Sequence, residues 1–171
     1  MLDELKLTDG NYFLVTAHRP RNVDKKDNFN KILSALGSLH ERYGVPVVYP
    51  MHPRSKKMLN VFGLKAPNGV KTIDAVGYLE FLQLMSHARL VLTDSGGIQE
   101  EACILRVPCV TLRENTERPE TLEVGSNMLA GVDSKKILDS VEAMLSKRTS
   151  WDNPFGDGKA TDRIMRVLLS E

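Results

Sequence analysis

Residues 90–102, LVLTDSGGIQEEA, contain the strongest local signal in the chain: a short apolar run that passes into two glycines and then into an acidic amphipathic stretch. An apolar run bounded by glycine is typical of a buried β-strand, and the apolar spacing after the glycines is typical of a helix. Glycines let another group approach the backbone closely, whereas acids near a helix start repel a bound anion. The segment predicts a strand leading directly into a helix, and its glycines and glutamates point to a ligand that is not a bare anion.

The same alternation of short apolar runs and amphipathic stretches recurs along the chain. Strands are expected at 12–17, 45–50, 70–75, 90–94, 108–112 and 127–131. Helices are expected at 29–44, 78–88, 98–106, 120–125 and 134–147. Strands that are apolar on both faces, each followed by a helix, are typical of a parallel sheet covered on two sides. The pattern therefore predicts a single α/β domain with a doubly wound, Rossmann-like parallel sheet.

Helix ends and the last segment give the expected boundaries. Gly44 is expected to cap the helix at 29–44 at its C-terminus, and Ser134 to cap the helix at 134–147 at its N-terminus. A final amphipathic helix within 158–171 follows a loop rich in Gly, Pro, Asn and Asp. This composition indicates that the last helix detaches from the main sheet.

Composition excludes several classes of protein. The 171 residues include 23 basic and 22 acidic side chains, for a net charge of +1, so charge alone recruits neither nucleic acid nor an anionic membrane. No apolar run reaches the roughly 20 residues that span a bilayer, and the first residues have no signal-peptide pattern. Cys103 and Cys109 have no metal-binding spacing and are interpreted as buried free thiols. We expect a soluble, cytoplasmic protein.

Polar clusters follow four of the expected strands, and ligands of such sheets bind beyond the carboxyl ends of the strands. These clusters are HRPRN at 18–22, MHP at 51–53, DSGG at 94–97 and RENTERPE at 113–120. Ser95, Gly96 and Gly97 lie where a strand turns into a helix, so their N–H groups are expected to point outward and bind phosphate. A tight turn capped by Ser95 is an equal alternative. The motif matches neither GxGxxG nor GxxxxGKS, which argues against NAD and Mg-ATP.

Other candidates surround this turn. Glu101, one helical turn beyond Gly97, is expected to accept hydrogen bonds from ribose hydroxyls, whereas Glu100 is expected to face elsewhere; a solvated acid is the alternative for Glu101. His18, Arg19 and Arg118 form a potential clamp for a diphosphate, although a histidine at a strand end is often structural. Neighbours with a solvated-loop alternative are Arg21, Arg113, Glu114 and Glu117, and His52 is equally ambiguous. His40 and His87 are interpreted as packing or surface residues.

Four motifs occur in one order along nearly the whole chain: VTAHRPRNVD at 15–24, LTDSGGIQEEA at 92–102, TERPE at 116–120 and NPFGDGKA at 153–160. In this combination they resemble the carboxy-terminal half of the non-hydrolysing UDP-N-acetylglucosamine 2-epimerase family. That family has two Rossmann-like domains arranged as in GT-B glycosyltransferases, with the nucleotide sugar between them. The resemblance implies that residues 1–150 are the UDP-binding domain and that residues 151–171 form a loop and helix crossing to an amino-terminal domain.

The resemblance also implies an isomerase that interconverts UDP-GlcNAc and UDP-ManNAc by elimination of UDP to 2-acetamidoglucal and readdition to the other face. His18 corresponds to a catalytic position near the diphosphate. UDP contacts correspond to Ser95, Gly96, Gly97, Glu101, Arg118 and Phe81, the last beside the uracil with backbone contacts from 76–81. In some members a second UDP-GlcNAc activates the enzyme through positions that correspond to Arg19 and His52. No cofactor and no metal are implied.

The acids to which the family's proton transfers at C2 are attributed belong to the amino-terminal domain, which this sequence does not contain. The chain is therefore expected to bind UDP weakly and to catalyse little by itself, and to form a homodimer when full length. Two alternatives stay open. One is the donor domain of a GT-B glycosyltransferase or hydrolysing epimerase, and the other is a non-catalytic nucleotide-binding module.

Overall fold

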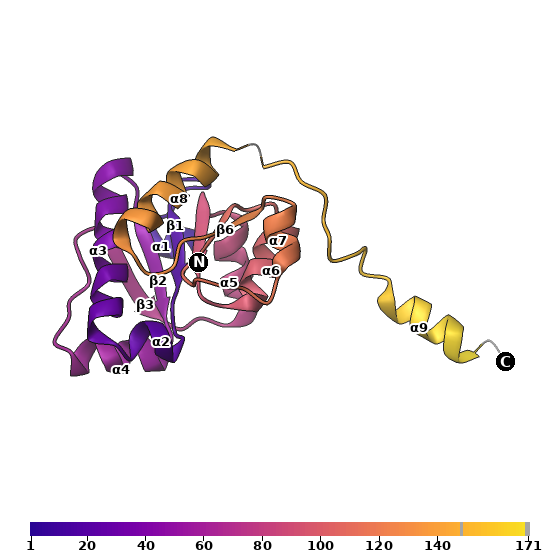
Figure 1. Cartoon of the computed structure of the whole chain (residues 1–171), viewed down its shortest axis with the longest axis horizontal. Helices are drawn as coiled ribbons and strands as arrows, with labels where there is room; N and C mark the ends of the chain where they lie inside the picture. Colours follow the sequence, from indigo (N-terminus) through magenta and orange to yellow (C-terminus); the bar gives the residue numbers. More distant parts are fainter. Residues whose placement is uncertain (148, 170–171) are drawn as a thin grey trace.

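One parallel sheet of six strands, in the order β3-β2-β1-β4-β5-β6, forms the centre of the computed structural model, which describes residues 1–147 and 149–169. Each expected strand is present. Their bounds are β1 Phe13–Thr16, β2 Val47–Met51, β3 Val70–Asp74, β4 Leu90–Thr93, β5 Cys109–Thr111 and β6 Asn127–Leu129. The order reverses at β1, which pairs with both β2 and β4 (Figure 1). Ligands of such sheets bind beside this reversal, beyond the carboxyl ends of the strands.

Helices cover both faces of the sheet, which confirms the doubly wound α/β fold. Their bounds are α1 Leu2–Leu5, α2 Pro20–Val23, α3 Lys26–Tyr43, α4 Pro53–Val61, α5 Tyr78–Ser86, α6 Gly96–Ile104, α7 Pro119–Glu123, α8 Ser134–Ser146 and α9 Ala160–Leu169. One core joins α3 and α8 to the sheet through Phe29, Ile32, Leu36, Ile137 and Val141. A second core joins α5 and α6 to the opposite face through Leu84, Met85 and Ala102.

The caps of two helices were predicted with different success. Gly44 ends α3 with φ of 66°, and its N–H donates to the carbonyl of His40, as a left-handed glycine cap does. The prediction for α8 was wrong by one residue, because the Asp133 side chain accepts from the N–H of Lys136 at 3.0 Å and is the N-cap. The Ser134 hydroxyl instead donates to the carbonyl of Lys31 at 2.8 Å, joining α8 to α3.

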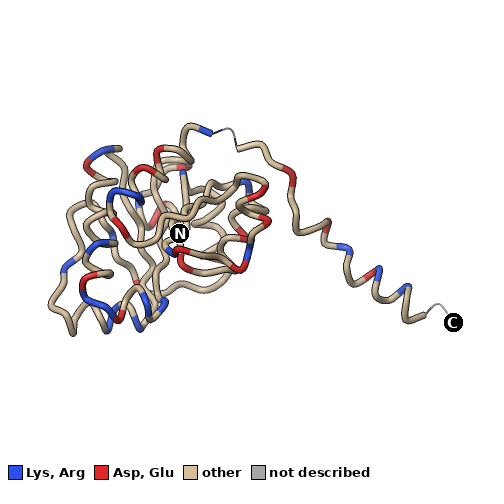
Figure 2. The backbone as a smooth tube through the Cα atoms, in the orientation of Figure 1, with Lys and Arg blue, Asp and Glu red and all other residues tan. Residues whose placement is uncertain are grey.

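The thiols of Cys103 and Cys109 are free and buried, as predicted. Burial raises the pKa of Cys109 to about 12, so this thiol is held in its protonated form. Basic and acidic residues are interspersed along the backbone of the body of the molecule (Figure 2). No helix within residues 1–147 and 149–169 is long and apolar enough to cross a membrane.

The last described segment leaves the body of the molecule. Trp151 is still anchored, since its Nε1–H donates to the carbonyl of Cys103 at 2.9 Å and its side chain is buried. Beyond it the chain runs outward to α9, which lies apart from the sheet (Figure 1). Every described residue of α9 is exposed. Its large apolar residues, 46% to 75% exposed, are Ile164, Met165, Val167, Leu168 and Leu169.

Candidate functional site

A cavity of about 380 Å³ opens at the carboxyl ends of β1, β2 and β3, next to the start of α6. Its lining brings together four residues that the sequence singled out, although they are far apart in the chain: His18, His52, Phe81 and Ser95. The rest of the lining consists of Thr16, Pro50, Ala75, Val76, Gly77, Tyr78 and Ile98. Phe81 also packs against the second core, which fixes one wall.

The start of α6 has free backbone donors next to this cavity, which Ser95 and Ile98 line and Gly96 and Gly97 do not. The N–H groups of Gly96, Gly97 and Ile98 have no acceptor within the part of the chain that the structure describes. Ser95 is the N-cap residue, but its hydroxyl makes no capping bond, so the alternative of a serine-capped turn is not what forms. One detail of the prediction was wrong: the N–H of Ser95 donates to Thr93 Oγ1 at 3.0 Å and does not point outward. The outward donors therefore begin at Gly96.

Neither glycine of this turn is required by the backbone, because neither has a positive φ. A Cβ placed on Gly97 would meet no other atom within 4 Å. A Cβ on Gly96 would lie 3.8 Å from Glu117 Oε2 and 4.0 Å from Arg118 Cγ, which are ordinary contacts. Side chains would therefore fit in the empty protein, and the space above the two glycines suits a group that comes from outside the chain.

Glu101 lies one turn into α6, and one of its two carboxylate oxygens has no hydrogen-bond donor among the described residues. The Tyr78 hydroxyl donates to Glu101 Oε1 at 3.2 Å. Glu101 Oε2 is buried and has no hydrogen-bond partner within the described residues. Burial raises the pKa of Glu101, and the neighbouring carboxylate of Glu100 raises it further, while the bond from Tyr78 lowers it. A buried acceptor without a donor is costly in free energy, and a ligand hydroxyl would satisfy it.

Arg118 reaches across the start of α6 from the loop before α7. Its Nε lies 2.5 Å from Glu100 Oε1, so the two side chains form an ion pair. The Nε–H does not point at this oxygen and makes no hydrogen bond to it. Glu100 therefore faces Arg118, whereas Glu101 faces Tyr78, so the two acids point in different directions, as expected. The contact between Glu100 and Arg118 is one that spacing along a single helix does not reveal.

Asp94, which sequence reasoning passed over, holds the loop after β1 in place. Its fully buried carboxylate accepts from the N–H groups of His18, at 3.0 Å, and Arg19, at 2.9 Å, and from Asn22 Nδ2 at 3.0 Å. His18 Nδ1 also lies 3.3 Å from Asp94 Oδ1. The signal was available, since an acid that ends a buried strand needs several donors.

His18 lies against His52, with ring centroids 5.3 Å apart and planes at 29°. His52 Nδ1 accepts from the N–H of Arg54 at 3.1 Å, which fixes that ring at the start of α4. Burial lowers the pKa of His18, and nearby His52 and Arg19 lower it further, against the opposing effect of Asp94. A lowered pKa favours the neutral imidazole at neutral pH.

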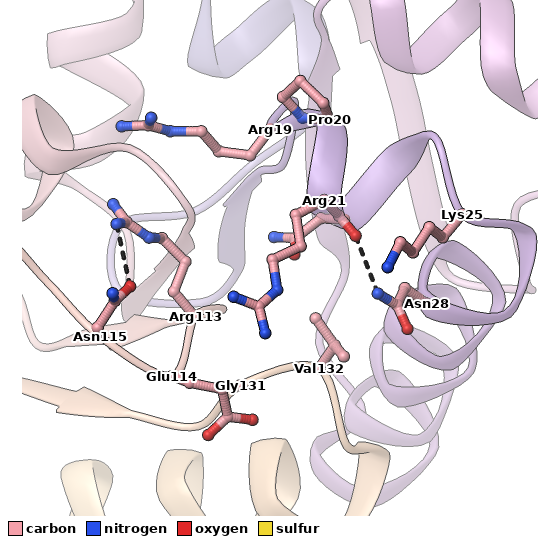
Figure 3. Close-up of a pocket in the computed structure, with 11 residues that line it drawn as sticks. Arg19, Pro20, Arg21, Lys25, Asn28, Arg113, Glu114, Asn115, Gly131 and Val132 are labelled. Carbon is pink, nitrogen blue, oxygen red and sulfur yellow. Dashed lines mark hydrogen bonds between the residues drawn. The ribbon is translucent and has the colours of Figure 1, made fainter.

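A second cavity, of about 590 Å³, is lined in part by the loop after β1 and by α2 (Figure 3). It is lined by Arg19, Pro20, Arg21, Asn22, Lys25, Asn28, Arg113, Glu114, Asn115, Gly131 and Val132. Arg113 pairs with Glu117 through two hydrogen bonds of 2.8 and 2.6 Å, and this contact lowers the pKa of Glu117 to about 2. Arg19 lines this cavity and His52 the first, so the two expected activator contacts lie at different cavities.

The described acids, histidines and cysteines are not clustered in the way that metal ligands are. Within residues 1–147 and 149–169, no group of three such side chains is placed to hold an ion. Free backbone N–H groups, a cation from Arg118 and an unsatisfied acceptor on Glu101 instead fit a ligand with both negative charge and hydroxyl groups.

Comparison with known proteins identifies the family to which the chain belongs. The family model described as UDP-N-acetylglucosamine 2-epimerase matches residues 1–169. The chain belongs to the UDP-N-acetylglucosamine 2-epimerase family. A curated relative in this family, the UDP-N-acetylglucosamine 2-epimerase of Methanocaldococcus jannaschii, is 51% identical over 164 residues, which cover 94% of this chain and 45% of the relative. The chain thus spans about half the length of this epimerase.

Solved structures of epimerases agree. The UDP-GlcNAc 2-epimerase from Methanocaldococcus jannaschii superimposes with a TM-score of 0.90 at 49% identity, covering 98% of this chain and 48% of that one. The same enzyme in complex with UDP-GlcNAc and UDP gives a TM-score of 0.87 at 51% identity, covering 94% of this chain and 45% of that one. The Escherichia coli heptosyltransferase WaaC with ADP, at 14% identity and a TM-score of 0.57, shares the fold only. The chain therefore has the Rossmann-like fold of the carboxy-terminal half of GT-B proteins.

Proposed function

We propose that the chain is the UDP-binding half of a two-domain enzyme that interconverts UDP-GlcNAc and UDP-ManNAc. The observation that carries this proposal is the start of α6, where two unobstructed glycines with free N–H groups lie one turn before the unsatisfied oxygen of Glu101. Phosphate fits the first feature and ribose hydroxyls fit the second. The Methanocaldococcus jannaschii epimerase structure with UDP-GlcNAc and UDP supports the same choice of ligand.

Each site residue then has a stated role. The diphosphate lies on the N–H groups of Gly96 and Gly97, at the positive end of the helix dipole, with the Arg118 guanidinium and the Ser95 hydroxyl beside it. Glu101 accepts from the ribose hydroxyls. The uracil lies in the 380 Å³ cavity against Phe81, with backbone contacts from residues 76–81.

In the elimination step the bond between the sugar C1 and the diphosphate oxygen breaks, and the proton on C2 is removed. Negative charge therefore develops on the departing UDP. Backbone N–H groups and a guanidinium that are already in place stabilise this charge without reorganisation. His18, held by Asp94, is the catalytic residue of this chain and lies next to the diphosphate. The C2 proton transfers belong to residues outside this chain.

An amino-terminal half completes the enzyme. The chain covers less than half of its relatives' length, and one wall of a cleft does not exclude water from a reactive intermediate. The crossover expected at 151–171 is formed by the described residues 151–169, with the exposed apolar residues of α9 packing on the other half; residues 170 and 171 lie outside the described chain. The complete protein is a homodimer in the cytoplasm, and the buried free thiols suit a reducing compartment. The isolated chain binds UDP weakly and does not epimerise.

A second UDP-GlcNAc acts as an activator and contacts Arg19 and His52. The 590 Å³ cavity supports the contact with Arg19, because Arg19, Arg21 and Lys25 line it and would attract a second diphosphate (Figure 3). Glu114 is the one acid that lines it in the described chain. His52 lines the other cavity, so the activator would have to reach both cavities.

Thermal unfolding with and without UDP tests the ligand. UDP at millimolar concentration is expected to raise the melting temperature of the chain, and Glu101→Ala or Arg118→Ala is expected to remove this shift. Arg42→Ala is the matched control, because it breaks the ion pair with Glu142 far from the site and should leave the shift intact. No shift for the unaltered chain at millimolar UDP would overturn the proposal.

A further inference from the structure

A buried polar network lies beneath Arg118 and plays no part in the contacts assigned above. Its core is a pair of side-chain amides, Gln99 in α6 and Asn127 in β6, which are 0% and 3% exposed. Asn127 Nδ2 donates to Gln99 Oε1 at 3.2 Å. The Thr111 hydroxyl donates to Asn127 Oδ1 at 2.8 Å, which fixes the orientation of that amide. The pair thus joins the phosphate-binding helix to the two strands at one end of the sheet.

Two hydroxyls connect this amide pair to the backbone of Arg118. On one side the N–H of Arg118 donates to Thr116 Oγ1 at 2.9 Å, and the Thr116 hydroxyl donates to Gln99 Oε1 at 2.5 Å. On the other side Asn127 Nδ2 donates to Thr121 Oγ1 at 3.0 Å, and the Thr121 hydroxyl donates to the carbonyl of Arg118 at 2.7 Å. Both backbone polar groups of Arg118 are therefore held by the same two amides.

We infer that the Gln99–Asn127 amide pair is a positioning device that sets where the Arg118 guanidinium lies over the start of α6. This inference rests on the proposed function, in which that guanidinium contacts the diphosphate. Arg118 is the N-cap of α7, with φ of −126° and ψ of 62°. Within the described residues one helical bond, from the N–H of Thr121 to its carbonyl at 3.1 Å, reaches its backbone, so the Arg118 N–H depends on other contacts for its position. The network supplies that constraint, and it fixes Arg118 relative to Gly96 because Gln99 belongs to the same helix.

Stability alone does not explain why the pair is polar. Gln99 Nε2 is buried and has no hydrogen-bond partner among the described residues, so the glutamine carries a desolvation cost that an apolar side chain would avoid. Networks of this kind specify one geometry at some expense in stability. A geometric role for the phosphate contact gives a reason to keep both amides.

The test measures how much the phosphates of UDP improve binding over uridine. Kd values for UDP and for uridine are measured on the 171-residue chain by titration followed by NMR spectroscopy, which reaches millimolar affinities. Asn127→Leu and Gln99→Met are expected to weaken UDP binding about tenfold and to leave uridine binding unchanged, because the uracil and ribose contacts lie elsewhere. A role in folding alone would change both Kd values equally or neither.

Two further variants keep the inference testable if the buried substitutions unfold the chain. Thr116→Val removes only the half-buried hydroxyl that joins Arg118 to Gln99, and it is expected to weaken UDP binding, whereas Thr116→Ser keeps a hydroxyl and should restore it. Ser140→Ala, a buried polar change in α8, is the matched control and should bind both ligands normally. In an Arg118→Ala background, Thr116→Val is expected to have no additional effect.

Unchanged UDP binding in folded Thr116→Val, or an effect of equal size in the Arg118→Ala background, would overturn the inference while leaving the proposed function standing. If the unaltered chain binds neither UDP nor uridine, the proposed function itself fails. The two failures are therefore distinguishable.

Discussion

The fold does not require glycine at position 97. Gly97→Ala is therefore predicted to have opposite effects on stability and on UDP binding. Gly97→Ala is expected to stabilise the chain by about 0.5–1 kcal/mol, because alanine favours a helix and its Cβ meets no other atom within 4 Å. The same methyl occupies the space proposed for phosphate, so UDP should no longer raise the melting temperature. Urea unfolding and thermal unfolding with UDP measure the two effects.

Asn30→Ala, on the exposed side of α3, is the control for this pair of measurements, since it also strengthens a helix and should leave the UDP shift intact. An alanine at Gly97 that left UDP binding unchanged would argue against phosphate contacts at this turn.

His18 gives a prediction about pH. Its pKa in the folded chain is lowered, chiefly by burial, below the value of about 6.5 that it has when unfolded. As pH falls through 6.5 the unfolded state therefore binds a proton before the folded state does, and stability decreases; above that pH the effect vanishes. His18→Gln is expected to lose less of its melting temperature between pH 7.5 and pH 5.5 than the unaltered chain does.

The comparison for this prediction is Asn30→Ala on the exposed side of α3, which changes no titratable group and should keep the unaltered slope. An unchanged slope in His18→Gln would mean that this imidazole does not contribute to the acid sensitivity of the fold.

Single residues also show where sequence reasoning stops. Four residues, Ser95, Gly96, Gly97 and Glu101, could be singled out because they follow one strand within two helical turns, and that local geometry is periodic. Asp94 was missed because its donors come from a loop 75 residues away in the chain, at Arg19. Contacts of such long range depend on sheet order, which spacing does not encode.

Among the elements, the strands and most of the helices were predictable because their apolar residues repeat with a clear period. Helices α1, α2 and α4 were not predicted. Four-residue helices such as Pro20–Val23 have no room for a period, and α4 is mostly exposed, so its core-facing side is represented by few apolar residues. The Pro after His52 was the available signal, since proline is common at the first position of a helix.

The C-terminal residues allow a prediction that separates the contribution of Trp151 to stability from that of α9. A chain ending at Asp152 lacks α9 and is expected to keep its free energy of unfolding, because all described residues of α9 are exposed. Trp151→Ala is expected to cost about 3 kcal/mol, because it removes a buried ring and the bond to the carbonyl of Cys103. Urea unfolding followed by circular dichroism measures both. A large loss on removing α9 would show that the helix stabilises the body of this domain.

At the scale of the whole molecule, the sheet brings the candidate residues to the carboxyl ends of its strands, where the cavity is open to solvent. His18 and Ser95 reach a shared cavity because β1 and β4 are neighbours and their carboxyl ends point the same way, and Phe81 reaches it from α5, which follows β3. The relatives are about twice as long as this chain. The fold could be predicted because its apolar pattern lies within this chain, whereas the two-sided cleft of the proposed function would involve residues outside it.

Adding that half back gives the last prediction. Mixing the chain with the separately expressed amino-terminal half of an epimerase relative is expected to restore conversion of UDP-GlcNAc to UDP-ManNAc, observed by NMR spectroscopy, while either half alone stays inactive. Ile164→Glu with Leu168→Glu places charge on the exposed apolar residues of α9 and should reduce this recovery at least tenfold, without changing UDP binding or stability of the chain alone. Release of free sugar or formation of a new glycoside would instead support hydrolysis or glycosyl transfer. Full recovery with the charged helix would show that α9 does not dock on the other half.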